Sequence, residues 1–367
     1  MNDAEAAKLP HQGGLLGLPW WSWAAPIIAG FAAAAKLGHV HIPPELVAPI
    51  LVGAVLAGVH HAEVIAHRIG EPYGTLVLAI AVTTIEVGLI VSLMLEGGAQ
   101  AEALARDTVF AAVMILLNGI VGLCLLVGGR RYGVQRYNLD GATAALTVLA
   151  PLLVLTMLLP NVTKAEPGPY YSPDQLAVVA VISVVLYLSY VFVQTVRHRE
   201  YFLAETPEEA HHGRPSAATT IASAGLMLVA LFGVVMMGKA LAPTIEALVS
   251  GIGAPHELVG VIIATIVLLP EGLAAVRAAR ADRLQDSLNL ALGSALASIG
   301  LTIPAVALVS LWLDVPLVLG LNDENAMLLV LSLFLPVISL RTGRTTILNG
   351  IVHLTVFAVY LLLVIVP

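Results

Sequence analysis

Charged residues and cysteine are both scarce in this chain. Only 11% of the 367 residues are charged, against roughly a quarter in an average soluble domain, whereas 59% are hydrophobic. The single cysteine, Cys124, excludes an intrachain disulfide and any cysteine-based metal site. No long run of charge of one sign is present, so nucleic acid binding has no support. The composition predicts an all-α, polytopic membrane protein.

The apolar stretches divide at charged residues, proline and glycine into about eleven spans, and a bilayer crossing needs about 20 residues. No signal peptide is expected in the polar N-terminus. The ninth span is long and the tenth is short. The predicted spans are 20–37, 45–66, 73–95, 108–127, 142–159, 175–196, 219–241, 258–276, 284–313, 326–340 and 345–366.

Basic residues predict the orientation of these spans, because Lys and Arg collect in cytoplasmic loops. The opposite side has only Lys36, Arg106, Lys164 and Lys239. We therefore expect a multi-pass inner-membrane protein with a cytoplasmic N-terminus and an extracytoplasmic C-terminus. The basic residues assigned to the cytoplasmic side are Lys8, Arg68, Arg130, Arg131, Arg136, Arg197, Arg199, Arg214, Arg277, Arg280, Arg283, Arg341 and Arg344.

The span count also indicates an internal repeat. With the first span set aside, ten spans form two groups of five, and an odd number makes the second group start from the opposite face. The predicted organisation is a cytoplasmic tail (1–19), a first helix (20–38), a first five-helix repeat (39–196), a cytoplasmic linker (197–218) and a second, inverted repeat (219–367). The linker carries a His/Glu-rich segment at 205–212, whose default interpretation is a solvated connection.

Two glutamates lie in the middle of apolar spans, Glu86 in VLAIAVTTIEVGLIVSL and Glu271 in VGVIIATIVLLPEGLAAV. A carboxylate at bilayer depth costs about 3 kcal/mol or more on insertion scales, so it needs a partner, a proton or a cation. Each lies about thirteen residues into its span, or roughly 20 Å at 1.5 Å per residue. Since the spans enter from opposite faces, both glutamates should meet near the midplane, where inverted-repeat transporters place their site.

The segments after each glutamate contain small residues and polar side chains. VMILLNGIVGLCLL holds Asn118, and LGSALASIGLTIPA holds Ser294 and Ser298. Amides and hydroxyls offer oxygen ligands to a cation. The alternative is that the serines bond their own helix carbonyls and that Asn118 joins two helices.

The stretches HHAEVIAHRIGEPYGTLVLAIAVTTIEVGLI and LVSGIGAPHELVGVIIATIVLLPEGLAAVRAARADRLQDSLNLALGSALASIGL resemble the two α-repeats of the cation/calcium exchanger superfamily, and the ChaA-type calcium/proton antiporters within it. The resemblance implies that Glu86 and Glu271 bind the cation, as calcium ligands, and exchange it for protons. It places Asn118 and Ser298 at equivalent positions of the following helices. No cofactor is expected, and the partners are small inorganic cations, protons and the bilayer; a homo-oligomer stays open.

The ion is left open between calcium, sodium and potassium. The broader family often has Gly-Asn before each glutamate, whereas this chain has Val82-Thr83 and Val267-Leu268. Calcium takes six to eight oxygens, so Thr83 or Thr84, backbone carbonyls or water would complete its shell. A cation channel would also use intramembrane acids, but inverted halves with one glutamate each are more natural for a transporter with a closing site at the midplane. A membrane-embedded enzyme is a further alternative, but HExxH and GxSxG motifs are absent.

Four further residues are candidates for gating or cytoplasmic access. Pro270 frees a backbone carbonyl beside Glu271, with a simple packing kink as the alternative. Glu71 suits a helix N-terminus, with a role in cation or proton access as the alternative. Glu63 and His67 form an i, i+4 pair at the cytoplasmic end of the second span. Such a pair can be a helix-end surface, a proton relay or, less often, part of a metal site.

Overall fold

The computed structural model describes residues 15–70, 73–95, 101–202 and 215–366, and this part of the chain is a bundle of long helices. The first part holds eleven helical elements and one strand. They are η1 (Leu15–Gly17), α1 (Trp20–Leu37), α2 (Pro44–Ile69), α3 (Tyr73–Met94), α4 (Ala101–Met114), the π-helical turn η2 (Ile115–Ile120), α5 (Val121–Tyr132), β1 (Gln135–Arg136), α6 (Leu139–Leu153) with η3 (Val154–Leu158) and η4 (Leu159–Asn161), and α7 (Pro173–Phe192).

The second part continues from the end of α7 and contains the remaining helices and the second strand. They are η5 (Val193–Arg197), η6 (Arg199–Tyr201), α8 (Ala217–Gly251), α9 (Glu257–Arg280), α10 (Leu284–Ala297), the π-helical turn η7 (Ser298–Thr302), α11 (Ile303–Leu313), α12 (Asp323–Ser339), β2 (Arg344–Thr345) and α13 (Ile347–Ile365). Elements that follow each other without a break form single long rods, such as α4–η2–α5 over 101–132 and α10–η7–α11 over 284–313.

The prediction of an all-α, multi-pass membrane protein is confirmed. Within the described residues, nine helical segments are long and apolar enough to cross a bilayer. The helices α1 and α12 also occupy predicted spans, but they fall outside this set. The ninth predicted span is a continuous 30-residue rod, and the tenth is the 17-residue α12. The prediction of a long ninth span and a short tenth span is therefore confirmed.

Local sequence signals determine where several helices begin. Ser172 accepts a hydrogen bond from the backbone N–H of Gln175, whose side chain reaches back to the Ser172 backbone, and Pro173 starts α7. The side chains of Asn138, Ser216 and Asn322 cap α6, α8 and α12 in the same way. Each cap satisfies a backbone N–H group at a helix start that the helix itself leaves unpaired.

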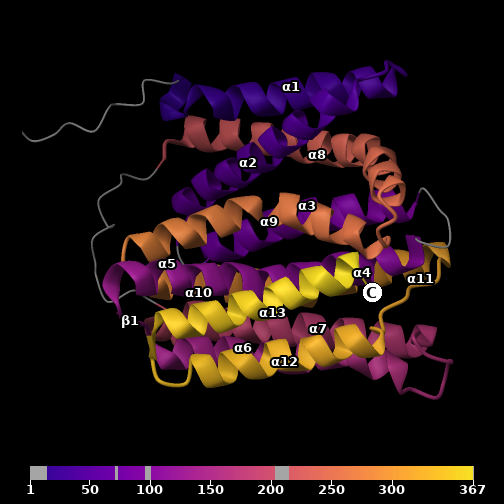
Figure 1. Cartoon of the computed structure of the whole chain (residues 1–367). Helices are drawn as coiled ribbons and strands as arrows, with labels where there is room; N and C mark the ends of the chain where they lie inside the picture. Colours follow the sequence, from indigo (N-terminus) through magenta and orange to yellow (C-terminus); the bar gives the residue numbers. More distant parts are fainter. Residues whose placement is uncertain (1–14, 71–72, 96–100, 203–214, 367) are drawn as a thin grey trace, which may run out of the picture.

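The helices pack in layers around two apolar clusters (Figure 1). The smaller cluster joins α1, α2 and α8 to parts of α3 and α9. The larger one is built from α4–α7 and α9–α13. Gly233 of α8 lies directly against Ala29 of α1, where a Cβ atom would have no room. The helices α3 and α9 stand between the two groups.

The chain enters α3 and α9 from opposite ends of the bundle (Figure 1). The end of α9 lies beside the end of α5, because the Tyr132 hydroxyl donates a 2.8 Å hydrogen bond to the Arg280 carbonyl oxygen. The start of α1 and the end of α13 also lie at opposite ends (Figure 1). This agrees with the predicted termini on different sides, although the domain boundaries and the membrane orientation stay predictions.

A short two-stranded sheet joins the two halves at one end of the bundle, with Gln135 opposite Thr345 and Arg136 opposite Arg344. The Tyr137 hydroxyl donates a 2.5 Å hydrogen bond to the Leu340 carbonyl, and burial raises the pKa of this phenol, so it stays a neutral donor. We call this the arginine-rich end, because α2, α5, α7 and α9 finish here and the α12–α13 turn lies here. Its described arginines are Arg68, Arg130, Arg131, Arg136, Arg197, Arg199, Arg277, Arg280, Arg283, Arg341 and Arg344.

Candidate functional site

Glu86 lies in the middle of α3 and is 4% exposed. Its Oε2 atom accepts two hydrogen bonds, from the Ser298 hydroxyl at 2.9 Å and from the Thr302 hydroxyl at 3.0 Å. Both donors belong to η7 in the other half of the chain. Hydroxyl donors stabilise a charged carboxylate, so Oε2 of Glu86 is fixed, whereas Oε1 accepts no such bond from the described residues.

Glu271 differs from Glu86 in having no hydrogen-bond partner on another described residue. Both of its carboxylate oxygens are buried, and neither forms a hydrogen bond within the described part of the chain. The carboxylate is close enough to those of Glu86 and Glu63 to interact with them electrostatically. A buried carboxylate without a donor is costly, so this group requires a proton or a cation.

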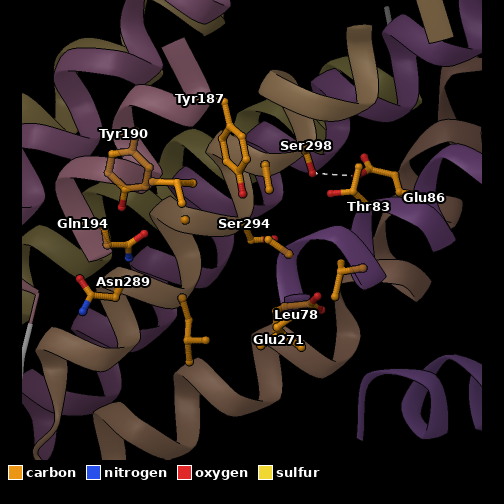
Figure 2. A pocket seen from close by; sticks show the side chains of 16 residues that line it. Leu78, Thr83, Glu86, Tyr187, Tyr190, Gln194, Glu271, Asn289, Ser294 and Ser298 are labelled. Atoms are coloured by element: carbon orange, nitrogen blue, oxygen red, sulfur yellow. Dashed lines mark hydrogen bonds between the residues drawn. The ribbon is translucent and has the colours of Figure 1, made fainter. Parts of the chain in front are cut away.

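Both glutamates line one cavity, which has a volume of about 120 Å³ (Figure 2). Figure 2 shows Glu86, Thr83 and Ser298 together at one side of this cavity, with Glu271 approaching from α9. Ser294 lies between the glutamates and the remaining polar residues. The lining residues come from α3, α7, η5, α9, α10 and η7, so the site draws on both halves.

Away from Glu86, the cavity is lined by polar side chains that the sequence reasoning did not find, namely Tyr187, Tyr190, Gln194 and Asn289. The Asn289 amide nitrogen donates a 2.7 Å hydrogen bond to the Phe202 carbonyl, immediately after η6. Because η6 begins at Arg199 and follows η5, which ends at Arg197, the cavity extends from the glutamates towards the arginine-rich end.

A π-helical turn brings the two hydroxyls to Glu86. In η7 the residues Ser298 to Thr302 have a wider turn than an α-helix, and such turns recur at functional sites. The matching rod of the first half has the π-helical turn η2 at Ile115–Ile120, which contains Asn118. Both rods that pack against the glutamate helices are therefore distorted at equivalent depth.

Of the predicted site residues, Glu86, Glu271, Thr83, Ser294 and Ser298 meet at the cavity. Ser298 bonds Glu86, so the alternative in which it bonds only its own helix is wrong.

Thr84 is not brought to the cavity. Its side chain is exposed, and its hydroxyl donates a 2.7 Å hydrogen bond to the Ile80 carbonyl of its own helix. Successive residues of an α-helix point about 100° apart, so Thr83 and Thr84 cannot both face the same site.

Asn118 does not line the cavity either. It is fully buried, and its amide nitrogen donates a 2.8 Å hydrogen bond to the Ser332 hydroxyl of α12. Through this amide nitrogen, Asn118 therefore joins two helices, which is the alternative role that the sequence left open. Its Oδ1 atom has no hydrogen-bond partner among the described residues.

The described candidates for gating do not line the cavity. Pro270 is half-buried within α9, which continues through it without a break, and it does not line the cavity. Glu63 and His67 are exposed on α2, and Glu63 interacts electrostatically with His67 and Arg277. Glu71 and the 205–212 segment lie outside the described residues.

His61 of α2 has a structural role at the contact with α1. Pro26 has no N–H to bond the Ser22 carbonyl in α1, and Nε2 of His61 donates to that oxygen at 2.8 Å instead. A carbonyl only accepts, so Nε2 carries the proton. Within the described ranges, no group of three His, Cys, Asp or Glu residues is placed to hold a metal ion.

Thr302 is the main residue that sequence reasoning missed. A signal was present, because Thr302 follows Ser298 by four residues and helical residues at this spacing share a face. The polar residues of α7 and η5 that line the cavity away from Glu86 had no comparable signal, since the hydrophobic residues around them are typical of an ordinary lipid-facing helix.

Comparison with known proteins gives one family. The sodium/calcium exchanger protein family matches residues 20–196 and 222–366. The putative ionic transporter y4hA of Sinorhizobium fredii is 48% identical over 95% of this chain and 97% of its own length. The sodium-potassium/proton antiporter ChaA of Escherichia coli is 38% identical over 85% of this chain and 86% of its own. The Ca²⁺/H⁺ antiporter ChaA of Bacillus subtilis is 25% identical over 66% and 69%.

Solved structures share the fold. Native YfkE superposes with a TM-score of 0.72 at 16% identity, covering 94% of this chain and all of YfkE. The H⁺/Ca²⁺ exchanger CAX superposes with a TM-score of 0.71 at 17% identity, covering 93% of this chain and 87% of CAX. These likenesses extend over nearly the whole bundle.

Proposed function

Because this chain belongs to the sodium/calcium exchanger protein family, a family of transporters, we propose that it is a calcium/proton antiporter whose shared site is formed by Glu86 and Glu271. It would export a cytoplasmic cation in exchange for protons by alternating access. The observation that carries the proposal is that two carboxylates from antiparallel helices line the same buried cavity.

The chemistry of coupling follows from these two carboxylates. With a divalent cation bound, two ionised glutamates balance its charge. Without the cation, desolvated carboxylates favour protons. The loaded site is then close to neutral in either case, which lets the bundle reorient without carrying bare charge through an apolar layer. The stoichiometry expected at these groups is one calcium ion for two protons.

Oxygen atoms are available to complete a calcium shell. Glu271 offers two free carboxylate oxygens, and Glu86 offers Oε1 together with the shared Oε2. The hydroxyls of Thr83 and Ser294 line the same cavity. Calcium prefers six to eight oxygens, so these groups with a few waters suffice.

The direction of the cavity supports loading from the cytoplasm. The cavity leads towards the arginine-rich end, which the positive-inside pattern assigns to the cytoplasm. An inward proton gradient would then drive the cation outward. The assignment to the inner membrane, with the N-terminus inside and the C-terminus outside, is part of this proposal.

Sodium/proton or potassium/proton antiport is the second candidate. It is favoured by the 38% identity with the sodium-potassium/proton antiporter ChaA, which is higher than the 25% identity with the Ca²⁺/H⁺ antiporter ChaA. The chain also has Thr83 and Leu268 where additional amide ligands would favour calcium.

Everted membrane vesicles with an imposed proton gradient test both candidates. Calcium, sodium and potassium are offered separately, and uptake against a concentration gradient, dissipated by a protonophore, distinguishes exchange from channel flux. The Glu86→Gln and Glu271→Gln variants should lose uptake, whereas Thr84→Val, outside the cavity, should keep it. Full uptake by either glutamine variant would contradict a site shared by Glu86 and Glu271. Uptake of sodium or potassium without uptake of calcium would instead support the second candidate.

A further inference from the structure

A second cavity lies far from the glutamates, in a groove between α6 and the end of α12. Its volume is about 440 Å³. One face of α6 supplies Leu139, Ala142, Thr143, Leu146, Thr147 and Ala150, and the facing wall is Pro336, Val337, Leu340 and Arg341. The groove is thus apolar along its length and has an arginine at one end.

The length of this groove matches one leaflet of a bilayer. Leu139 and Ala150 are eleven helical steps apart, or roughly 16 Å at 1.5 Å per residue. The hydrocarbon core of a bilayer is about 30 Å thick, so a single leaflet measures about 15 Å. Leu139 begins α6 at the arginine-rich end, and Ala150 lies midway along the continuous helical segment Leu139–Asn161. One acyl chain would fill the groove from the headgroup level to the midplane.

One arginine lines the outer end of the groove, and two more lie in the adjoining turn and sheet. Arg341 lines it, and Arg344 follows in the same turn. Arg136 is the direct antiparallel partner of Arg344 in the small sheet. All three are exposed, and none forms an ion pair with a described residue. Asp140, in the first turn of α6, is the acidic residue nearest in sequence to the groove mouth, which leaves an excess of positive charge.

The pairing of Arg136 with Arg344 points to an anionic ligand. Like charges directly opposite each other in a ladder are destabilising unless a counter-charge lies between them. Contacts hold the turn in place, because the Tyr137 N–H donates to the Gly343 carbonyl and a Cβ on Gly343 would approach that of Leu139. The turn that carries Arg341 and Arg344 is therefore held beside the start of α6.

We propose that this groove binds an anionic phospholipid, with one acyl chain between α6 and α12 and the headgroup phosphate at Arg136, Arg341 and Arg344. Basic pockets between membrane helices on the cytoplasmic side suit anionic headgroups. The inference is independent of which cation the exchanger carries, because the groove shares no lining residue with the cavity of the glutamates.

Native mass spectrometry of the full chain in detergent tests this site. Phosphatidylglycerol, phosphatidylcholine with the same acyl chains, and inorganic phosphate are added separately. Phosphatidylglycerol should bind in preference, and Arg341→Gln/Arg344→Gln should weaken that binding by about tenfold. The matched control is Arg130→Gln/Arg131→Gln, which removes two exposed arginines at the same end but outside the groove.

A second pair of variants tests the apolar part. Thr147→Phe fills the groove from an exposed position and should also weaken phosphatidylglycerol binding, whereas Val181→Phe, on the exposed face of α7, should not. Equal binding of the two phospholipids, or equal losses in the two arginine pairs, overturns the proposal. Displacement of the lipid by inorganic phosphate would show that the arginines form a simple anion site. A dimer that is lost only in Thr147→Phe would show that the groove is a contact between two copies of the chain.

Discussion

The hydroxyls of Ser298 and Thr302 both donate to one atom, Oε2 of Glu86, at 2.9 and 3.0 Å. Glu271, in contrast, has no hydrogen-bond donor among the described residues. The two carboxylates line the same cavity, but they differ in their hydrogen-bond partners. One is held in place by the opposite half of the chain, and the other is free to bind what enters the cavity.

Removing the Thr302 hydroxyl should weaken cation binding. A hydrogen bond to a charged group contributes about 1.5–3 kcal/mol, and its loss favours the protonated carboxyl. We expect Thr302→Val to raise the KM for the cation by about tenfold or more. Thr84→Val removes a hydroxyl from the lipid-facing side of α3 and is the control. Unchanged KM values in Thr302→Val vesicles would contradict a role for this bond.

Cation binding should release protons from both glutamates. Acidification of the side that loads the cation should therefore raise its KM, since protons occupy the same oxygens. Calorimetry in buffers of different ionisation enthalpy counts the protons, and we expect release to fall from about two towards about one in either glutamine variant. This measurement does not require a transporting protein. Equal release by wild type and variants would show that the protons come from elsewhere.

His353 should stabilise the rod that carries Asn118. It is fully buried in α13, where Nδ1 contacts the Leu117 carbonyl at 2.9 Å and Nε2 contacts the Ser339 hydroxyl at 2.8 Å. The carbonyl needs a donor, so Nδ1 carries the proton. Leaving such a buried group unpaired costs about 1–3 kcal/mol.

We expect His353→Phe to lower the thermal unfolding midpoint of the solubilised protein. His41→Phe, at an exposed position before α2, is the matched control and should leave the midpoint in place. An equal decrease in the two variants would indicate a general effect of the added ring rather than loss of this contact.

Gly350 should be intolerant of a side chain, because α13 crosses α5 there at close range. A Cβ atom on Gly350 would meet the Leu126 backbone nitrogen, and it would lie 2.8 Å from the Gly122 carbonyl oxygen. Backbone atoms cannot move aside as a flexible side chain can. Gly350→Ala should lower the unfolding midpoint, whereas Gly225→Ala in α8, where the new Cβ meets open space, should not. Equal midpoints in the two variants would mean that the crossing relaxes.

The positions of the helices could be predicted well from the sequence, because lipid requires long apolar segments and the arginines mark their ends. The predicted start of the first span at Trp20 and the limits of the ninth at Leu284 and Leu313 coincide with the observed ends. Glu86 and Glu271 were predictable for the same reason, since a charge at this depth is conspicuous.

The direction in which an individual side chain points from its helix could not be predicted in the same way. Thr83 and Thr84 have the same chemistry and differ only in the direction set by one helical step. Asn118 has the amide expected of a ligand, but its nitrogen bonds Ser332, a residue 214 positions away whose proximity only the packed bundle determines. The π-helical turn that aims Ser298 and Thr302 at Glu86 likewise depends on tertiary packing.

The separation of Glu86 from its two hydroxyl partners also bears on how the protein is made. Ser298 and Thr302 lie 212 and 216 residues further along the chain. During synthesis, α3 therefore enters the membrane long before either hydroxyl has been polymerised. The nascent first half must carry Glu86 with a proton or a temporary partner, and the site matures only when the segment Leu284–Leu313 has been inserted.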